Sequence, residues 1–314
     1  MSEFNISAGS KINPTEKVFH SLKEAEKTPD LVFKLDLHYK NYSTLPGIIF
    51  HFSNLQELIL INNKIESIPD EIANLQNLQK LELSGNRVKV IPDALCCLKN
   101  LKTLVLSWNE LKSLPKCISK LENLEWLGLN HNKLEFLPDE ISNLINLQVL
   151  LVSENELTSL PNNIGNLKKL KKLRISNNLI NSIPESIGNL SNLLKFEIQE
   201  NNLTNLPESI GNLNSLQKLR AYKNLLTTVP ETIGNLTNLE KLLLYENEIN
   251  SLPDSLGNLT NLEELDLSYN ELEHLPKTIS SLKGLDCLEL RKNKFIPDEI
   301  IKIKDLLPDI NISF

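Results

Sequence analysis

The chain has 314 residues, of which 40% are hydrophobic, 5% aromatic and 23% charged. This composition is ordinary for a globular protein and predicts a core of aliphatic side chains. The net charge of −7 disfavours nucleic-acid binding, which needs a basic surface, and no apolar run reaches the roughly 18 residues of a membrane-spanning helix.

The N-terminal segment, residues 1–31, is interpreted as a cap on the first edge of the core. Its opening residues contain no apolar segment typical of a secretion signal, which leaves a cytoplasmic and an exported protein both open. Residues 15–27 are predicted to form an amphipathic helix with Thr15 as its N-cap. The apolar face of this helix would consist of Val18, Phe19, Leu22 and Ala25.

Residues 32–297 repeat one motif with a period of 23 residues. The motif is L-x-x-L-x-L-x-x-N-x-L-x-x-L-P-x-x-I-x-x-L-x-N, and residues 55–77 show it in full. Eleven complete repeats begin at residues 32, 55, 78, 101, 124, 147, 170, 193, 216, 239 and 262. A twelfth repeat begins at Leu285 and is two residues short.

Each part of the repeat predicts a local structure. LxxLxL predicts a short strand whose side chains at positions 4 and 6 face the core. Asparagine at position 9 is expected to bond to unpaired backbone groups and to form a ladder across repeats. Repeat one has Lys40 at this position and Asn41 one place later, so its rung should be irregular. Proline at position 15 suits the first turn of an α- or 3-10 helix on the outer face.

The C-terminal segment, residues 298–314, is interpreted as a second cap. DEIIKIKDLL supplies its apolar side chains, which are Ile300, Ile301, Ile303, Leu306 and Leu307. A disordered tail is the alternative for these residues.

The repeat resembles those of the leucine-rich-repeat family over almost the whole chain. We expect an α/β solenoid with a parallel sheet on its concave face and short α- or 3-10 turns on its convex face. The helical turns of neighbouring repeats need a wider spacing than the strands do, so the solenoid must curve with the strands on the inner side. The LPxxIxxLxNL variant is similar to Ras-scaffold repeats and to bacterial repeats, including those of spirochaetes. The opening SLKEAEKTPDLVFKLDL is more similar to the bacterial members.

The sequence shows no constellation of catalytic residues. Phosphate-binding loops, GxSxG and HExxH are absent, and five glycines from 165 to 257 share position 19 of the outer turn. His131 and Glu154 occupy position 8 of successive repeats, but two ligands are too few for a zinc site. The four cysteines show no paired framework or zinc spacing. We therefore expect no enzyme activity, metal, cofactor or disulfide.

The concave face should carry the side chains at positions 3, 5 and 7, with positions 8 and 10 along its edge. In repeats four to six these are apolar or small, namely Val105, Trp126, Gly128, Val149 and Leu151, with Trp108 at the edge. Gly128 is predicted to leave a notch beside the Trp126 ring, and covering that ring should hide roughly 200 Å². Such exposed clusters are typical of contact surfaces. The alternative is that Trp126 packs on its neighbours and stiffens the sheet.

Charge separates along the later repeats. Repeats seven to nine are basic and include Arg174 and Arg220, whereas repeats ten and eleven are acidic and include Asp266. Tyr222 and Tyr245 are interleaved with these charged residues. Such zones can steer a partner with complementary charge, and ordinary solvated surface is the alternative.

The sequence therefore predicts a monomeric, non-catalytic protein-protein recognition module that binds a folded partner on its concave face. The resemblance implies a small GTPase or another signalling protein as partner, or a host surface protein for the bacterial members. The alternatives are a self-associating structural protein and a small-molecule or enzymatic site in the Gly128 notch.

Overall fold

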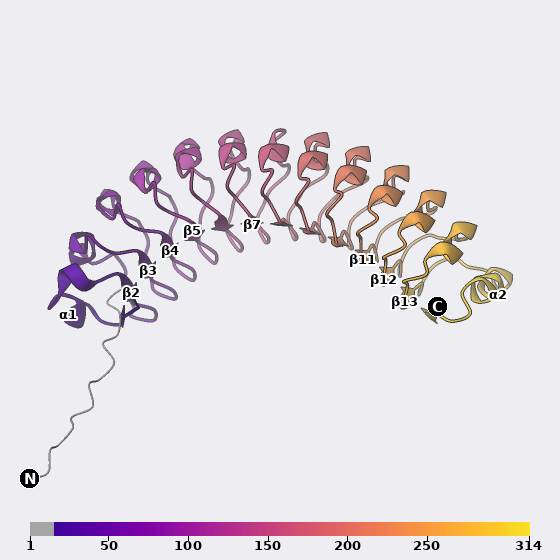
Figure 1. The fold of residues 1–314 in the computed structure, drawn as a ribbon, viewed down its shortest axis with the longest axis horizontal. Helices are drawn as coiled ribbons and strands as arrows, with labels where there is room; N and C mark the ends of the chain where they lie inside the picture. The colour runs from indigo at the N-terminus through magenta and orange to yellow at the C-terminus, as the bar shows by residue number, and fades with distance from the viewer. Residues whose placement is uncertain (1–15) are drawn as a thin grey trace, which may run out of the picture.

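A computed structural model describes residues 16–314, which form one arch (Figure 1). A 14-stranded parallel sheet lines the inner side, and helical turns follow one another along the outer side. Strand order in the sheet is chain order from β1 to β14, so each strand pairs with its sequence neighbours. The predicted curved solenoid is confirmed.

Each repeat contributes one strand at positions 3–5. The repeat strands are β2 Lys34–Asp36, β3 Glu57–Ile59, β4 Lys80–Glu82, β5 Thr103–Val105, β6 Trp126–Gly128, β7 Val149–Leu151, β8 Lys172–Arg174, β9 Lys195–Glu197, β10 Lys218–Arg220, β11 Lys241–Leu243, β12 Glu264–Asp266 and β13 Cys287–Glu289. The turns of the outer side are 3-10 helices at Gly47–His51, Asp70–Asn74, Asp93–Cys97, Lys116–Lys120, Asp139–Asn143, Ile164–Asn166, Glu185–Asn189, Glu208–Asn212, Glu231–Asn235, Asp254–Asn258 and Lys277–Ser281. A further 3-10 turn, Pro29–Leu31, precedes the first repeat.

The core lies between the sheet and the 3-10 turns. Leu58 and Leu60, at positions 4 and 6 of repeat two, are fully buried, and Ile72 from the outer turn meets them in the same core. Neighbouring repeats cover each other's apolar side chains, so no repeat has a core of its own. This alternation leaves positions 3, 5 and 7 on the concave surface, as predicted.

Proline at position 15 precedes the outer turn instead of opening it. Pro69 has an extended backbone with ψ 160°, and its carbonyl accepts a hydrogen bond from Ile72 N at 3.1 Å. The fixed φ of proline suits this conformation, and its missing N–H leaves no bond unmade. The prediction that proline lies within the first turn is therefore wrong by one residue.

The asparagine ladder at position 9 is confirmed. Asn86 Nδ2 donates to the carbonyl of Leu60 in the preceding repeat and to that of Leu83 in its own repeat, each at 2.9 Å. Its Oδ1 accepts a hydrogen bond from Ile65 N of the preceding repeat at 3.0 Å. One amide thus satisfies backbone groups in two repeats. The first rung is irregular as predicted, because Lys40 replaces the asparagine and its own N–H donates to Asn63 Oδ1 at 3.0 Å.

The N-terminal cap differs from the predicted helix over residues 15–27. Val18–Phe19 forms β1 and pairs in parallel with β2, while α1 spans only Leu22–Ala25. Phe19 is 1% exposed and covers the first edge of the core, whereas Val18 points to solvent. This two-residue alternation belongs to a strand. The predicted helix is therefore present only over Leu22–Ala25, and its extent over residues 15–27 is wrong. Thr15, the predicted N-cap, lies outside the described residues.

The C-terminal segment forms α2, Pro297–Leu306, followed by β14, Asn311–Ser313, which pairs with β13. Ile303 and Leu307 are buried against the last repeat, whereas Ile301 remains 58% exposed. The helix and the added strand together cover the second end of the core.

Cys96 and Cys117 form a disulfide with a Cα–Cα distance of 5.9 Å, so the expectation of no disulfide is wrong. They occupy position 19 of repeat three and position 17 of repeat four. In later repeats glycine holds position 19 because the next turn passes very close. A Cβ on Gly211 would lie 2.3 Å from the carbonyl oxygen of Thr232. The disulfide therefore joins two consecutive outer turns at positions 19 and 17, where the later repeats have a glycine close to the next turn.

Candidate functional site

Trp126 begins β6 on the concave sheet, between β5 and β7. A Cβ placed on Gly128 would lie 3.7 Å from Trp126 Nε1 and 3.0 Å from Val105 Cγ1. The indole therefore leans along its own strand over Gly128, which is buried. The predicted open notch is wrong, because Trp126 and Val105 already occupy the space beside Gly128.

The part of Trp126 that remains available is 41% of its surface. A partner that covers it would hide roughly 100 Å², about half of the area expected from the sequence. At about 25 cal/mol/Å² this burial contributes about 2.5 kcal/mol before the costs of association. Val105, Val149 and Leu151 are half-buried on the adjoining strands. We call these four side chains the apolar strip.

Trp108, His131 and Glu154 occupy position 8 of three successive repeats and line the edge beside the apolar strip. The rings of Trp108 and His131 stack with centroids 3.4 Å apart, and His131 Nδ1 lies 2.6 Å from Glu154 Oε2. All three have left-handed backbone, with φ of 58°, 53° and 56°. This conformation is unfavourable for bulky side chains and easier for Asn62 or Gly85, which hold the same position in other repeats.

The ring stack and the contact between His131 and Glu154 stabilise this row. Trp108 presents 60% of its surface to solvent. His131 and Glu154, weighed above as a metal pair, contact each other, with His131 Nδ1 2.6 Å from Glu154 Oε2. Within residues 16–314 no group of three or more His, Cys, Asp or Glu side chains could hold a metal ion.

Arg174, Glu197 and Arg220 occupy position 5 of β8, β9 and β10. Arg174 Nε donates to Glu197 Oε2 at 2.5 Å, and an Arg220 terminal nitrogen lies 3.8 Å from Glu197 Oε1. The Glu197 side chain is only 4% exposed, whereas the two arginine side chains are 33% and 31% exposed. One buried carboxylate thus holds two partly exposed guanidinium groups.

The charges of this cluster shift several pKa values. Burial opposes ionisation of Glu197, but the hydrogen bond from Arg174 and the nearby positive charges outweigh it and hold its pKa below the ordinary value. Burial, together with the positive charge of Arg174, lowers the pKa of Lys172. Burial and Arg220 lower the pKa of Lys218 in the same way. The concave surface here carries more positive charge than its carboxylate neutralises.

The tyrosines predicted to contribute to binding lie together. Tyr222 and Tyr245 stack with ring centroids 4.2 Å apart, and burial together with the hydrogen bond to Tyr222 raises the pKa of Tyr245. Asp266, one repeat further on, accepts a hydrogen bond from Ser268 N at 3.0 Å within its own repeat. The structure therefore pairs the two tyrosines and ties Asp266 to local backbone.

A concave pocket of ≈ 270 Å³ lies between the position-8 row and the arginine cluster. Its walls include His131, Glu154, Arg174, Gln199 and Arg220. Sequence reasoning missed Gln199 and the central role of Glu197. The Arg-Glu-Arg alternation at position 5 of three successive repeats was the available signal.

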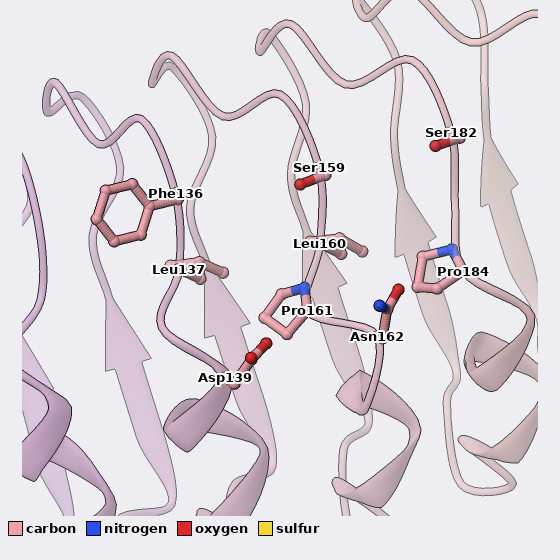
Figure 2. Close-up of a pocket in the computed structure, with 9 residues that line it drawn as sticks. All are labelled: Phe136, Leu137, Asp139, Ser159, Leu160, Pro161, Asn162, Ser182 and Pro184. Carbon is pink, nitrogen blue, oxygen red and sulfur yellow. The ribbon is translucent and has the colours of Figure 1, made fainter.

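A second pocket, of ≈ 260 Å³, lies on a flank of the solenoid (Figure 2). Phe136, Ser159 and Ser182 occupy position 13 of three successive repeats there, on the segments that run from each strand to its outer turn. Phe136 is 54% exposed. This flank contains none of the predicted binding residues, so Phe136 is a matched aromatic control for the concave face.

The family description "Leucine-rich repeat region" matches residues 32–128 and 162–247, more than half of the chain. Two further leucine-rich-repeat descriptions match residues 237–295 and 123–144. The chain therefore belongs to the leucine-rich-repeat family. No curated protein matches it in sequence.

Among solved structures, a leucine-rich-repeat protein of Leptospira interrogans is 32% identical, with a TM-score of 0.61 over 95% of this chain and 100% of that one. The ectodomain of the Arabidopsis thaliana receptor kinase GASSHO1/SCHENGEN3 is 33% identical, with a TM-score of 0.75 over 94% of this chain and 39% of that one. An internalin of Listeria monocytogenes, InlF, is 23% identical with a TM-score of 0.72 over 92% and 88%, and shows the shared fold alone. In residues 16–314 no helix is long and apolar enough to cross a membrane.

Proposed function

We propose that this protein is a non-catalytic recognition module that binds a folded protein partner along its concave face, with Trp126 as the principal contact. One observation carries the proposal. Trp126 exposes 41% of its surface at the centre of the apolar strip, on a sheet whose other residues at positions 3 and 5 are mostly charged. Exposed aromatic side chains in such surroundings are typical of the residues that dominate protein interfaces.

The neighbouring groups supply the rest of the interface. Trp108, held by its stack on His131, extends the aromatic surface to the edge of the sheet. The stacked Tyr222 and Tyr245 offer a second flat aromatic surface further along. The basic and acidic zones orient the partner as it approaches, because complementary charge mainly sets specificity and association rate.

A similar structure supports a protein partner in general. The GASSHO1/SCHENGEN3 ectodomain was solved in complex with CASPARIAN STRIP INTEGRITY FACTOR 2. For this chain, resemblance implies one of two partner classes. The first is a small GTPase or another signalling protein, and the second is a host surface protein. The likeness to the Leptospira interrogans leucine-rich-repeat protein over 95% of the chain supports a bacterial setting.

The test compares partner affinity for the wild type, Trp126→Ala and the flank control Phe136→Ala. We expect Trp126→Ala to weaken binding by about 2 kcal/mol or more, which is roughly 30-fold in Kd, while Phe136→Ala leaves it unchanged. An unchanged affinity in a correctly folded Trp126→Ala variant would refute the proposal. Light scattering over a range of concentrations should show a constant monomer mass, and a doubling would instead identify a self-associating protein.

A further inference from the structure

Arg174 and Arg220 are positioned for a ligand that the solenoid itself does not supply. They lie two strands apart, roughly 10 Å at the spacing of parallel strands, and both contact the buried Glu197. Arg174 uses its Nε and Arg220 one terminal nitrogen for this contact. A guanidinium has five N–H donors, so each arginine keeps donors for a further acceptor. Both side chains line the concave pocket.

The charge around the pocket favours an anion. Positions 3 and 5 of β8, β9 and β10 hold one carboxylate, Glu197, and five cations, Lys172, Arg174, Lys195, Lys218 and Arg220. Burial first, and then the nearby positive charges of Arg174 and Arg220, lower the pKa values of Lys172 and Lys218, so these cations repel one another. Glu154, the other carboxylate that lines the pocket, is contacted by His131 Nδ1 at 2.6 Å. A bound carboxylate would relieve the repulsion and accept the hydrogen bonds of both arginines.

Gln199 supplies an independent indication of a ligand. Its side chain lines the same pocket, the residue is only 9% exposed, and its Oε1 is buried without a hydrogen-bond partner in the described part of the chain. Buried amides without partners are unfavourable and uncommon. A peptide N–H is the donor that such an oxygen lacks, and it lies close to a carboxylate in any acidic residue of a peptide.

We propose that this pocket binds an aspartate or glutamate residue of an acidic peptide segment. Arg174 and Arg220 bind the side-chain carboxylate, and the Gln199 amide binds the peptide group beside it. The inference deepens the proposed function and rests on it, because the acidic segment belongs to the same protein partner. The pocket adjoins the apolar strip, so one partner can contact both.

The test uses a fluorescently labelled hexaglutamate peptide, with hexalysine as the opposite-charge control, and measures fluorescence anisotropy at low and physiological salt. Arg174→Gln alone would leave the buried Glu197 with only Arg220, at 3.8 Å, as its ion-pair partner. The informative variant is therefore the neutral triple Arg174→Gln/Glu197→Gln/Arg220→Gln. Lys34→Gln is the matched control, since it also removes one net positive charge from the concave face. Lys34 lies six strands from Arg174, roughly 30 Å at the spacing of parallel strands.

We expect hexaglutamate to bind the wild type and Lys34→Gln alike, and to bind the triple variant at least about tenfold more weakly. Glu197→Gln should bind more tightly than the wild type, because it frees both arginines for the peptide. A purely structural role for this cluster predicts no such gain. Absence of hexaglutamate binding, or equal weakening in Lys34→Gln and the triple variant, overturns the inference. If inorganic phosphate binds to the protein and hexaglutamate does not, the ligand of this pocket is a free anion and the acidic peptide is ruled out.

This assay needs no partner, so its failure is distinct from failure of the proposed function. Hexaglutamate binding with an unchanged partner affinity in Trp126→Ala would keep the acid site and remove the Trp126 contact. If hexaglutamate does not bind but Trp126→Ala weakens partner binding, the Trp126 contact stands and the acid site is removed.

Discussion

Replacing Arg174 by glutamine should destabilise the fold more than replacing Glu197 by glutamine, although each change removes one charge from the same pair. Glu197 is 4% exposed and receives the hydrogen bond of Arg174. In Arg174→Gln the carboxylate stays buried, with Arg220 at 3.8 Å as its remaining ion-pair partner. In Glu197→Gln the two arginines keep contact with water, because about a third of each is exposed.

The expected magnitude follows from these distances and exposures. Unit charges about 4 Å apart interact by about 4 kcal/mol at an effective dielectric constant of about 20. Solvent exposure of Arg174 and the persistence of Arg220 reduce this by roughly half, to about 2 kcal/mol for Arg174→Gln. Glu197→Gln should cost about 1 kcal/mol, because it leaves no buried charge unpaired. The double variant should be more stable than the sum of the two changes implies, by about 1–2 kcal/mol.

Urea unfolding of the wild type, both single variants and the double variant measures these free energies. Lys34→Gln is the control, because its ion pair with Glu57 is about a third exposed on both sides and should contribute less than about 1 kcal/mol. Additivity of the two changes within about 0.5 kcal/mol, or a larger loss in Glu197→Gln than in Arg174→Gln, would refute this reasoning.

Three further predictions concern stability. Folding lowers the pKa of Glu197, so its contribution to the free energy of unfolding is present above the ordinary pKa of 4.5 and is lost as the pH falls below that value. The urea midpoints of the wild type and Glu197→Gln should therefore converge as the pH is lowered from 4.5. A constant difference between the two midpoints would contradict the lowered pKa of Glu197. Gly211→Ala should lose about 2 kcal/mol or more, because its Cβ would lie 2.3 Å from the Thr232 carbonyl oxygen. Gly47→Ala, which meets nothing within 4 Å, should be neutral or slightly stabilising, and equal effects of the two alanines in urea unfolding would be incompatible with the packing described. Non-reducing peptide mass spectrometry should find Cys96 linked to Cys117, and Cys117→Ser should lower the free energy of unfolding by about 3 kcal/mol for a loop of this length. Changing the free, exposed Cys97 to serine should have little effect, and an unlinked Cys117 peptide would argue against the bond.

The repeat region could be predicted because each structural role recurs at one position of the period. The apolar side chains at positions 4 and 6, most of them leucines, are buried in every repeat, so their period alone indicates which face is concave. The N-terminal cap has no such repetition. Val18 and Phe19 fit one face of a helix as well as a strand, and the unpaired edge of β2 decides in favour of the strand. The Cys96–Cys117 pair was missed because contact between positions 19 and 17 of successive repeats depends on the path of the outer turns.

The location of the candidate site could likewise be predicted from the repeat, whereas its side-chain arrangement could not. The period places Trp126, Val105, Val149 and Leu151 on one surface, but it does not determine that the indole leans over Gly128. The left-handed backbone at position 8 is likewise hidden, because Trp108 is a residue type that rarely adopts it. Side-chain direction and local backbone therefore set the details of this surface, while the repeat sets its location.

The central claim is tested most directly by capturing proteins from host and self lysates on three baits, the wild type, Trp126→Ala and Phe136→Ala, and identifying them by mass spectrometry. The account predicts a protein that the wild type and Phe136→Ala retain and that Trp126→Ala loses. A partner retained equally by all three folded baits, or lost only with Phe136→Ala, would contradict binding through the concave face at Trp126.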